Sequence, residues 1–442
     1  MKRVAIILTM ASVSIGMLGQ SQAPPPSPVS GTLQQDSPTP TYESSNRPLS
    51  GVQNQDIGES SESRNTFVPN ITFAQGWDSN APRVTGGNAE QSSGISTISG
   101  GFRLNRETNK NATSLGYTGG GQIYTVDSDL NSQFHRFDFS QTVVAGRWTF
   151  LVADGLSYQK DAFAGFPSLL FPGLPNGSGG TDFQPGITPG ESIIGIDVGR
   201  LNNTASGQVT YGFSRATTLT SNFSYGLLHA FDDSGFLNNT QWQTGMGLDH
   251  KFGRDTLGVN YSFTRFGYDV FNQSFDSHTV QLAYSHILTG RWSFEVSGGP
   301  AFVVSNFGGF EITKVYGSGK VGFRYHMPKG DLGLQYSRSV TNGSGALPGA
   351  ITDDVGVTLG RKLSRSLSAN LSGGYARNSG TFVNSMFNTF NVGAGVTHTL
   401  GRYASVSMGY TGQRQTGSSY AGLTRHSAVV TFNWSFRPIV LH

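Results

Sequence analysis

The sequence predicts an all-β fold, an antiparallel up-and-down transmembrane β-barrel of about 18 strands, with 16 strands as the alternative. Three observations predict it: a glycine-rich composition with few charges, a two-residue alternation of apolar and polar side chains, and short turns that alternate with longer connections. The 442-residue chain contains 60 Gly and only 13% charged residues, against about 25% in ordinary soluble domains. Because Gly costs about 1 kcal/mol relative to Ala inside a helix, a large helical enzyme is not expected.

The first 23 residues have the parts of a secretory signal peptide. Lys2 and Arg3 form a basic start, residues 4–18 form a short apolar stretch, and residues 21–23 place Ser and Ala where a signal peptidase reads small side chains. We therefore expect residues 1–23 to be removed after export. The chain contains no Cys, which excludes a lipoprotein anchor beside the cut and any disulfide framework.

Residues 24–65 form a second zone, rich in Pro, Ser, Gln and Asn and almost free of large aliphatic side chains. Such a segment cannot bury enough apolar surface to offset its ordering entropy, so we expect a disordered periplasmic tail. The chain has 30 Lys and Arg against 27 Asp and Glu, and removing Lys2 and Arg3 leaves 28 against 27. With no basic excess, no nucleic-acid partner is expected.

Residues 66–442 are expected to form the barrel because apolar and polar side chains alternate along this part of the chain. In the last predicted strand, Val430, Phe432 and Trp434 share one face, whereas Thr431 and Asn433 share the other. A period of two is typical of strands with one apolar and one polar face. A soluble β-sandwich has the same alternation, so the period alone does not distinguish the two folds.

The spacing of the turns distinguishes them. Short basic turns recur between strand runs, at residues 146–147, 253–254, 290–291, 360–361 and 401–402, with equivalents at 214–215 and 328–330. Longer polar connections lie between them, near residues 227–238, 267–276, 305–313, 341–350, 377–386 and 412–424. Short turns at one end and long loops at the other are typical of a transmembrane barrel, and an immunoglobulin-like sandwich would not keep this register.

Counting the runs between these turns predicts 18 strands, an even number that brings both termini to the short-turn, periplasmic side. The predicted strands span residues 69–79, 93–105, 112–125, 133–145, 147–158, 203–214, 217–228, 239–252, 256–267, 277–288, 291–304, 314–326, 331–341, 351–361, 365–377, 387–400, 403–412 and 425–436.

Aromatic residues near the strand ends support a membrane location. The outward faces carry them beside the turns, as expected of interfacial girdles: Trp148, Trp242, Trp292, Tyr403, Trp434 and Phe436. The alternation of Val430, Phe432, Trp434 and Phe436 in the last strand also resembles the C-terminal assembly signal of bacterial outer-membrane β-barrel proteins, although residues 437–442 follow it here. The segment Gly76-Trp77-Asp78-Ser79-Asn80 at the end of the first strand resembles the group known as beta-barrel porin 2.

These resemblances imply where the protein resides and what handles it. A member of this class would be located in the outer membrane of a Gram-negative cell after signal-peptide export. Its partners would be outer-membrane lipid, periplasmic chaperones and the barrel-assembly machinery. The sequence leaves the oligomeric state open.

Motifs that would support catalysis or metal binding are incomplete. Residues 317–320 end like a phosphate-binding loop, but Val321 replaces the Ser or Thr that binds magnesium. Residues 127–138 begin like a calcium loop, but Ser132 replaces the turn Gly and the bidentate Glu is missing. The nine His have no metal-binding spacing. We therefore expect no catalytic residue, no metal site and no cofactor.

The predicted lumen is lined by Gly, Ser, Thr, Asn and Gln with few charges. Lys320, Arg324 and His326 share the inward face of one predicted strand, Glu295 lies inward on the preceding strand, and Arg103 is expected to lie inward on the second. Such charges can simply be solvated in a polar interior. They can also form part of a constriction that selects solutes.

One connection, residues 160–202, is too long to be an idle loop in a compact barrel. It combines apolar residues with Asp161, Asp182, Glu191 and Asp197. Our hypothesis is that it folds into the barrel and that its acids face Lys320 and Arg324 across a constriction. The alternative is a lid or adhesive surface outside the barrel.

The expected function is a porin-like channel for the passive diffusion of small hydrophilic solutes through a polar lumen, without enzymatic chemistry. Two alternatives stay open at this point. One is a closed structural or adhesion barrel that acts through its outer loops. The other is an accessory barrel of polysaccharide export that uses the periplasmic tail as a docking arm.

Overall fold

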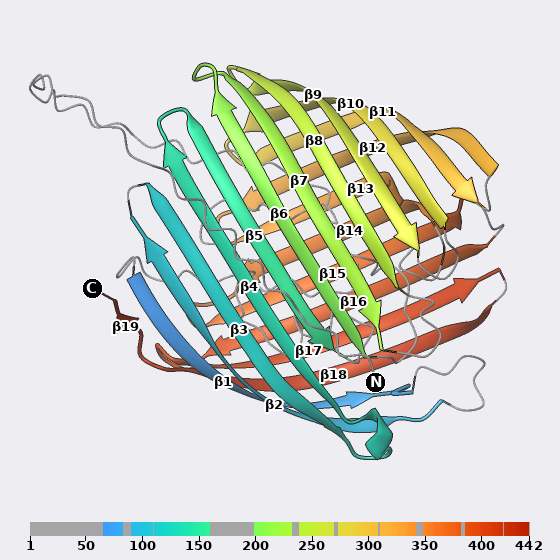
Figure 1. Cartoon of the computed structure of the whole chain (residues 1–442). Coiled ribbons are helices and arrows are strands. Elements are labelled where there is room, and N and C mark those ends of the chain that lie inside the picture. The colour runs from blue at the N-terminus through green and yellow to red at the C-terminus, as the bar shows by residue number, and fades with distance from the viewer. Residues whose placement is uncertain are drawn as a thin grey trace, which may run out of the picture. The chain divides into compact units, whose positions relative to one another are not determined.

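The computed structural model describes residues 65–82, 90–108, 110–159, 199–231, 238–268, 273–307, 310–341, 347, 349–381, 385–418 and 420–441. These residues form one closed sheet in which each long strand pairs antiparallel with the next (Figure 1). The eighteenth strand pairs with the first, which closes the ring. The predicted barrel and its count of 18 strands are therefore confirmed.

The strands are long, as a tilted barrel wall requires. Their bounds are β1 Asn65–Asp78, β2 Ser93–Glu107, β3 Asn111–Tyr124, β4 Ser132–Ala145, β5 Trp148–Gln159, β6 Arg200–Gly212, β7 Thr217–Ala230, β8 Asn239–Phe252, β9 Asp255–Tyr268, β10 Gln273–Thr289, β11 Trp292–Phe307, β12 Phe310–Met327, β13 Gly330–Thr341, β14 Ala350–Lys362, β15 Leu367–Gly380, β16 Met386–Thr399, β17 Ala404–Gly417, β18 Tyr420–Ser435 and the short β19 Ile439–Val440.

The connections alternate between the two ends of the barrel. Tight turns join each even strand to the following odd strand, and three of them place Gly146, Gly253 and Gly401 at positive φ, 63°, 67° and 92°. Glycine reaches this conformation without the steric cost that a Cβ would add. The end with these turns is called the turn end below, and the other the loop end.

Three of the predicted long connections are wrong. Residues 267–276, 305–313 and 412–424 are mostly strand, because β9 to β12 and β17 to β18 extend well toward the loop end. The reason is a reversal of polarity along these strands. Near the loop end, Phe275 and Val303 are buried on the inner face, whereas Arg265 and Asp276 lie on the outer face.

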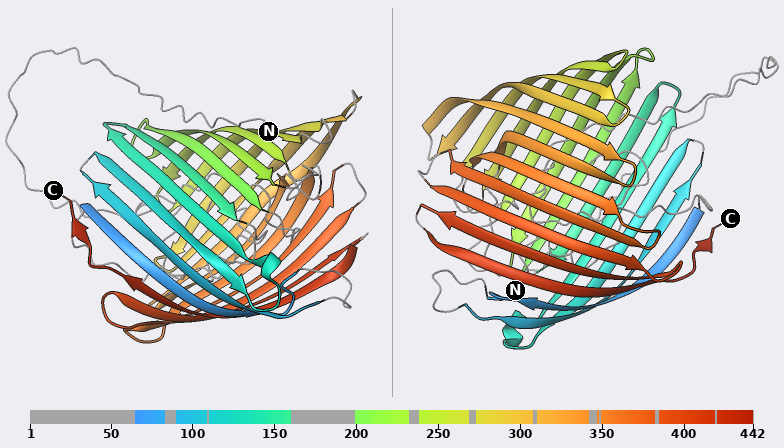
Figure 2. Two further views of the ribbon diagram at one scale, coloured as in Figure 1. Left: turned by 60° about the horizontal axis from the view of Figure 1, so that its bottom comes forward. Right: turned by 180° about the vertical axis from the view of Figure 1, so that it is seen from behind.

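Away from that end, the outer face is apolar around the whole ring. Large hydrophobic side chains alternate outward and are about half exposed, which is the pattern of a surface covered by lipid. Examples from successive parts of the ring are Phe73, Ile98, Val152, Phe223, Met246, Val259, Leu282, Val321, Leu334, Leu371, Val392, Met408 and Val430. Figure 2 shows the tilted strands that carry them from two further sides.

Aromatic rings gather on the outer face beside the turns, as predicted. The Trp292 ring stacks on Tyr325 with centroids 3.9 Å apart, and Trp148 lies 4.4 Å from Tyr211. Trp148, Trp434 and Phe436 are all more than 40% exposed. Trp242 was also expected beside a turn, but it lies on the outer face near the loop end of β8. These amphipathic rings are suited to the boundary between lipid and water.

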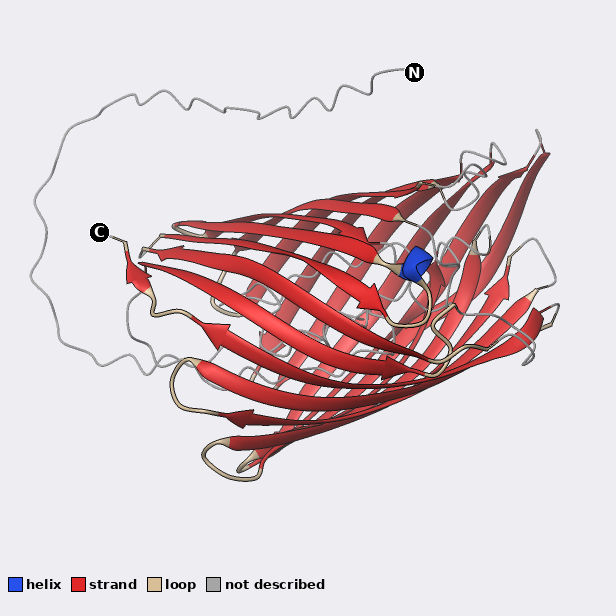
Figure 3. Ribbon diagram, turned by 90° about the horizontal axis from the view of Figure 1, so that it is seen from below, coloured by secondary structure: helices blue, strands red, loops and turns tan. Residues whose placement is uncertain are grey.

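Helical structure is minimal in the described part of the chain. A single turn of 3-10 helix, Ser128–Leu130, follows β3, with the Asp127 carboxylate accepting from the Asp129 amide (Figure 3). No helix among the described residues is long and apolar enough to cross a membrane.

Candidate functional site

The inner face of the barrel is polar over most of its height. Side chains that alternate with the outward apolar residues are Ser, Thr, Asn and Gln on nearly every strand, and many are buried: Thr72, Thr97, Ser99, Thr118, Gln122, Thr204, Ser206, Ser224, Gln241, Ser277, Ser305, Ser337, Thr352, Ser372, Asn378, Thr389, Asn391, Ser407, Thr411, Gln413, Gln415 and Thr431. Figure 2 shows the backbone of the strands that carry these residues. The inner face therefore offers hydrogen bonds rather than apolar contact.

The predicted inward charges on β11 and β12 meet in an ion pair. Lys320 Nζ lies 2.8 Å from Glu295 Oε1, and the two side chains are 6% and 22% exposed. Glu295 is directly opposite Gly322 in the register, so Lys320 is its diagonal neighbour on the same face. Gly322 has no side chain that would separate them. The two charged groups meet because they project from the same face of two adjacent strands as diagonal neighbours.

Polar neighbours continue from this ion pair along the inner wall. Lys320 is opposite Ser337 on β13, and Ser337 is opposite Asp354 on β14. The Ser337 hydroxyl donates to Asp354 Oδ1. On the other side, Gln281 Nε2 donates to Ser318 Oγ at 3.0 Å. The polar stripe from Gln281 on β10 to Asp354 on β14 therefore includes one cation, Lys320, and the carboxylates of Glu295 and Asp354.

Arg324 and His326 also lie on the inner face of β12, as predicted. Arg324 is opposite Ser293 and Gly333 in the register. His326 contacts the Asp331 carboxylate on β13 near the turn end. Arg103 lies inward on β2, alternating with the outward Phe102 and Leu104.

A second ion pair on the inner face was missed by the sequence analysis. On β4, Arg136 Nε lies 2.7 Å from Asp138 Oδ2, and its Nη2 lies 3.0 Å from Oδ1. These side chains are 49% and 37% exposed. The two-residue alternation that places Ser140 inward also places Arg136 and Asp138 inward. The sequence pattern could therefore have predicted that both charges face the inside of the barrel. The ring order places β4 eight strands from β12, almost across the barrel.

The acids predicted to face this wall belong to the long connection. Asp161, Asp182, Glu191 and Asp197 lie outside the described residues, as does most of the segment 160–202. The constriction that they were expected to form therefore stays a hypothesis. Residues 1–64, which include the predicted signal peptide and tail, also lie outside the described part.

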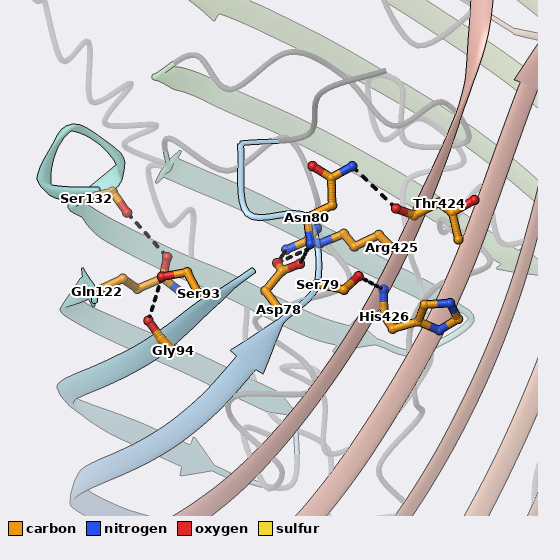
Figure 4. Close-up of polar contacts among 10 residues, drawn as sticks. All are labelled: Asp78, Ser79, Asn80, Ser93, Gly94, Gln122, Ser132, Thr424, Arg425 and His426. Carbon is orange, nitrogen blue, oxygen red and sulfur yellow. Dashed lines mark hydrogen bonds and ion pairs between the residues drawn. The ribbon is translucent and has the colours of Figure 1, made fainter. Parts of the chain in front are cut away.

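The first strand and the last strand are joined by a buried ion pair (Figure 4). Arg425 Nε donates to Asp78 Oδ2 at 2.8 Å, and the two side chains are 2% and 0% exposed. Asp78 Oδ1 also accepts from the Asn80 amide at 3.0 Å. Ser79 exchanges hydrogen bonds with the His426 backbone at 2.9 and 2.8 Å. Residues 76–80, the segment that resembles the beta-barrel porin 2 group, therefore connect β1 to β18 at the seam where the barrel closes.

The predicted assembly residues lie on the outer face of β18. Val430, Trp434 and Phe436 are more than 40% exposed, and Phe432 shares their face. The residues after Phe436 continue the pairing, because Ile439 and Val440 form β19 against β1 and the Leu441 amide donates to the Asn65 carbonyl. The extra C-terminal residues thus extend the closing seam.

At the loop end, the inner face carries an apolar cluster of Phe266, Tyr268, Phe275 and Val303. The Gly349 amide donates to Tyr268 Oη at 3.1 Å, which ties the β13–β14 connection to β9. A Cβ at Gly349 would lie 2.7 Å from the Phe275 ring, and its φ is +82°. This position therefore requires glycine for both its conformation and its close approach.

No group of three His, Asp or Glu that could hold a metal ion is found in the described ranges. The described inner face carries hydrogen-bonding groups and the ion pairs given above. Such a wall can exchange contacts with water and with polar solutes.

Comparison with known proteins yields similarity of architecture. No protein-family model matches the chain, and no curated protein matches it. Similar solved structures include OccK2 of Pseudomonas aeruginosa in complex with glucuronate, at 13% identity and a TM-score of 0.45, covering 84% of this chain and 98% of that one. The outer membrane protein OpdK of the same organism has 10% identity and a TM-score of 0.45, covering 85% and 100%.

A BenF-like porin from Pseudomonas fluorescens Pf-5 has 11% identity and a TM-score of 0.46, covering 84% of this chain and 99% of that one. At these values the similarity identifies neither a family nor a substrate. The chain's own geometry establishes a closed antiparallel barrel of 18 strands with an apolar outer band and a polar, charge-bearing inner face.

Proposed function

We propose that this protein is a porin-like channel of the Gram-negative outer membrane that lets small hydrophilic solutes diffuse through its lumen. The observation that carries the proposal is the division of polarity across one closed wall. Large apolar side chains face outward, and Ser, Thr, Asn, Gln and paired charges face inward. Barrels of 16–18 strands are wide enough to enclose an aqueous channel.

The proposed orientation follows from the connections. Tight turns in bacterial barrels face the periplasm and longer loops face outward. Both ends of the strand array, at Asn65 and after Ser435, lie at the turn end. We therefore place both termini in the periplasm, with residues 1–23 removed after export and the residues from 24 to the start of β1 at Asn65 forming a periplasmic tail. Periplasmic chaperones and the barrel-assembly machinery would act before insertion.

The proposed path runs between the two inner-face ion pairs. Passive diffusion requires no catalytic group, because the polar wall replaces part of the hydration of a passing solute. Arg136 with Asp138, and Lys320 with Glu295, supply matched charges on nearly opposite parts of the ring. The Arg136–Asp138 pair is the more exposed of the two. Its charges would therefore act more strongly on passing ions.

The constriction hypothesis is retained as part of this proposal. The acids at positions 161, 182, 191 and 197 would face the inner wall that carries Lys320 and Arg324. The inward placement of both bases supports it. Deleting residues 163–198 should then raise single-channel conductance and change ion selectivity. Unchanged conductance and selectivity would contradict a constriction formed by this loop.

Charge-selective substitutions test the proposed path. Arg136→Gln leaves Asp138 unbalanced and should shift the reversal potential in a salt gradient toward cation selectivity, whereas Asp138→Asn should shift it toward anions. Lys320→Gln and Glu295→Gln should give the same pair of opposite shifts. Arg361→Gln is the matched control, because Arg361 is exposed on the outer face at the turn end. Equal reversal potentials for all five variants would contradict conduction past these pairs.

A further inference from the structure

The outer face of β13 to β18 carries a row of arginines where its apolar band ends. On β13 the outward residues read Leu332, Leu334, Tyr336 and Arg338 from the turn end upward. On β15 they continue with Tyr375, Arg377 and Ser379, and on β17 with Tyr410, Gly412, Arg414 and Thr416. Three alternate strands thus share one order: apolar side chains, then a tyrosine, then an arginine.

Each tyrosine is held by a bond to the following strand; Tyr336 and Tyr375 are level in the register, whereas Tyr410 lies four residues closer to the turn end. Tyr336 Oη donates to Asp353 Oδ1 at 2.9 Å, and Tyr375 Oη donates to Asn388 Oδ1 at 2.8 Å. Tyr410 Oη lies 2.8 Å from His426 Nδ1. Tyrosine rings with a fixed polar tip are typical of the boundary between the hydrocarbon and the headgroups of a membrane.

The register places the arginines in nearly one row. Asp353 is directly opposite Arg338 on one side and Arg377 on the other. Arg414 is opposite Phe390, one outward position closer to the turn end than Asn388, the partner of Arg377. Because neighbouring strands are about 4.8 Å apart, each arginine lies roughly 10 Å from the next. This spacing suits several headgroups side by side.

The row has a surplus of positive charge. Asp353 is its single acidic side chain, and Arg338 Nη1 lies 3.0 and 3.3 Å from the two Asp353 oxygens. Arg377 and Arg414 are exposed. Within the part of the chain that the structure describes, neither has a carboxylate within 4.0 Å. Two guanidinium groups are therefore free to bind an external anion.

The same height on the other arc of the barrel has a different character. Outward residues near the loop end of β1, β3 and β8 include Trp77, Ile123 and Trp242, all about half exposed. On β9, Arg265 has its own partner, since its Nε lies 3.6 Å from Asp276 Oδ1. Among the residues that the structure describes, the surplus thus lies on the arc from β13 to β18, which argues for a localised binding surface.

We propose that Arg338, Arg377 and Arg414 form a binding surface for anionic, phosphate-bearing lipid headgroups at the loop-end boundary of the membrane. Arginine binds phosphate oxygens through two parallel N–H donors, and the lipid tails would lie against the apolar residues below each tyrosine. The proposal rests on the proposed membrane location of the barrel. In the proposed orientation the surface faces the outer leaflet.

Native mass spectrometry of the refolded protein in a neutral detergent tests this surface, with phosphatidic acid and phosphatidylcholine added in turn as probes. The wild-type protein should retain phosphatidic acid in preference to phosphatidylcholine, and millimolar inorganic phosphate should not displace it. Arg377→Gln with Arg414→Gln should weaken the retention about 25-fold, at roughly fivefold for each basic side chain near an anionic lipid surface. Replacing both arginines with Lys should preserve most of it.

The matched control is Arg361→Gln with Arg402→Gln, which removes two exposed arginines at the turn end of the same arc. This control should retain phosphatidic acid as the wild-type protein does. Equal retention by the Arg377/Arg414 variant and the wild type would overturn the proposal, as would displacement by free phosphate.

Channel activity separates this proposal from the proposed function. The Arg377/Arg414 variant should conduct like the wild type, because both side chains lie on the outer face. A protein that binds phosphatidic acid at this row without conducting would refute the channel and leave the lipid surface standing. A conducting protein without the lipid preference would do the reverse.

Discussion

The Asp78–Arg425 ion pair should dominate the stability of the closing seam. Replacing Arg425 with Met leaves the Asp78 carboxylate, 0% exposed, without its cationic partner on the inner face. Removing one partner of a buried ion pair typically costs about 3–5 kcal/mol. The backbone pairing of β1 with β18, from Asn70 to Asp78, stays in place in this variant, so the loss measured reports on the ion pair.

The assay is reversible urea unfolding in lipid vesicles, followed by tryptophan fluorescence. We expect Arg425→Met to lower the unfolding free energy by about 3–5 kcal/mol. Adding Asp78→Asn should recover part of the loss, because the stranded charge is then removed. Arg136→Met is the control, since the Arg136–Asp138 pair is 49% and 37% exposed and such pairs contribute about 1 kcal/mol or less. An Arg425→Met protein within 1 kcal/mol of wild type would refute this reasoning.

Two further substitutions test the packing and the facing of the wall. Gly349→Ala should destabilise the loop-end cluster more than Gly146→Ala destabilises its turn, because both glycines have positive φ but only the Gly349 Cβ would meet a ring, 2.7 Å away. The backbone strain at such a position is about 1–3 kcal/mol. Equal losses of unfolding free energy in urea for the two variants would contradict the contact. Val259→Arg on the outer face of β9 should cost about 2–4 kcal/mol in vesicles, whereas Asn260→Arg, its inward neighbour, should cost less; the reverse order would show that the faces are assigned wrongly.

The strand pattern was largely predictable because lipid and water select opposite side chains at successive positions. The bounds of β8, Asn239–Phe252, match the predicted 239–252, and most other strands agree within a few residues. The predicted strand bounds are wrong near the loop end, where apolar side chains face inward and charged side chains face outward. Near the loop end, Phe275 and Val303 turn inward while Asp276 faces outward. Alternation continues there with reversed polarity, so the strand extensions were interpreted as loops.

The sequence pattern predicted which face of the barrel the candidate site residues lie on, but it did not predict which residues they contact. Alternation placed Lys320 and Glu295 inward on neighbouring strands. Their contact depends on the β11–β12 register, in which Glu295 is opposite Gly322, and no local pattern specifies that offset. The Asp78–Arg425 pair joins residues 347 positions apart and requires closure of the ring. Long-range pairings of this kind follow from the topology, which a period of two does not contain.

The measurement that tests the central claim most directly is the single-channel conductance of the refolded protein, lacking residues 1–23, in a planar bilayer. The account predicts steady, ohmic current steps in a simple salt solution, because the proposed channel is a water-filled path inside the closed 18-stranded wall, along its polar inner face. A fully folded, membrane-inserted barrel that produces no current steps would contradict the proposed channel.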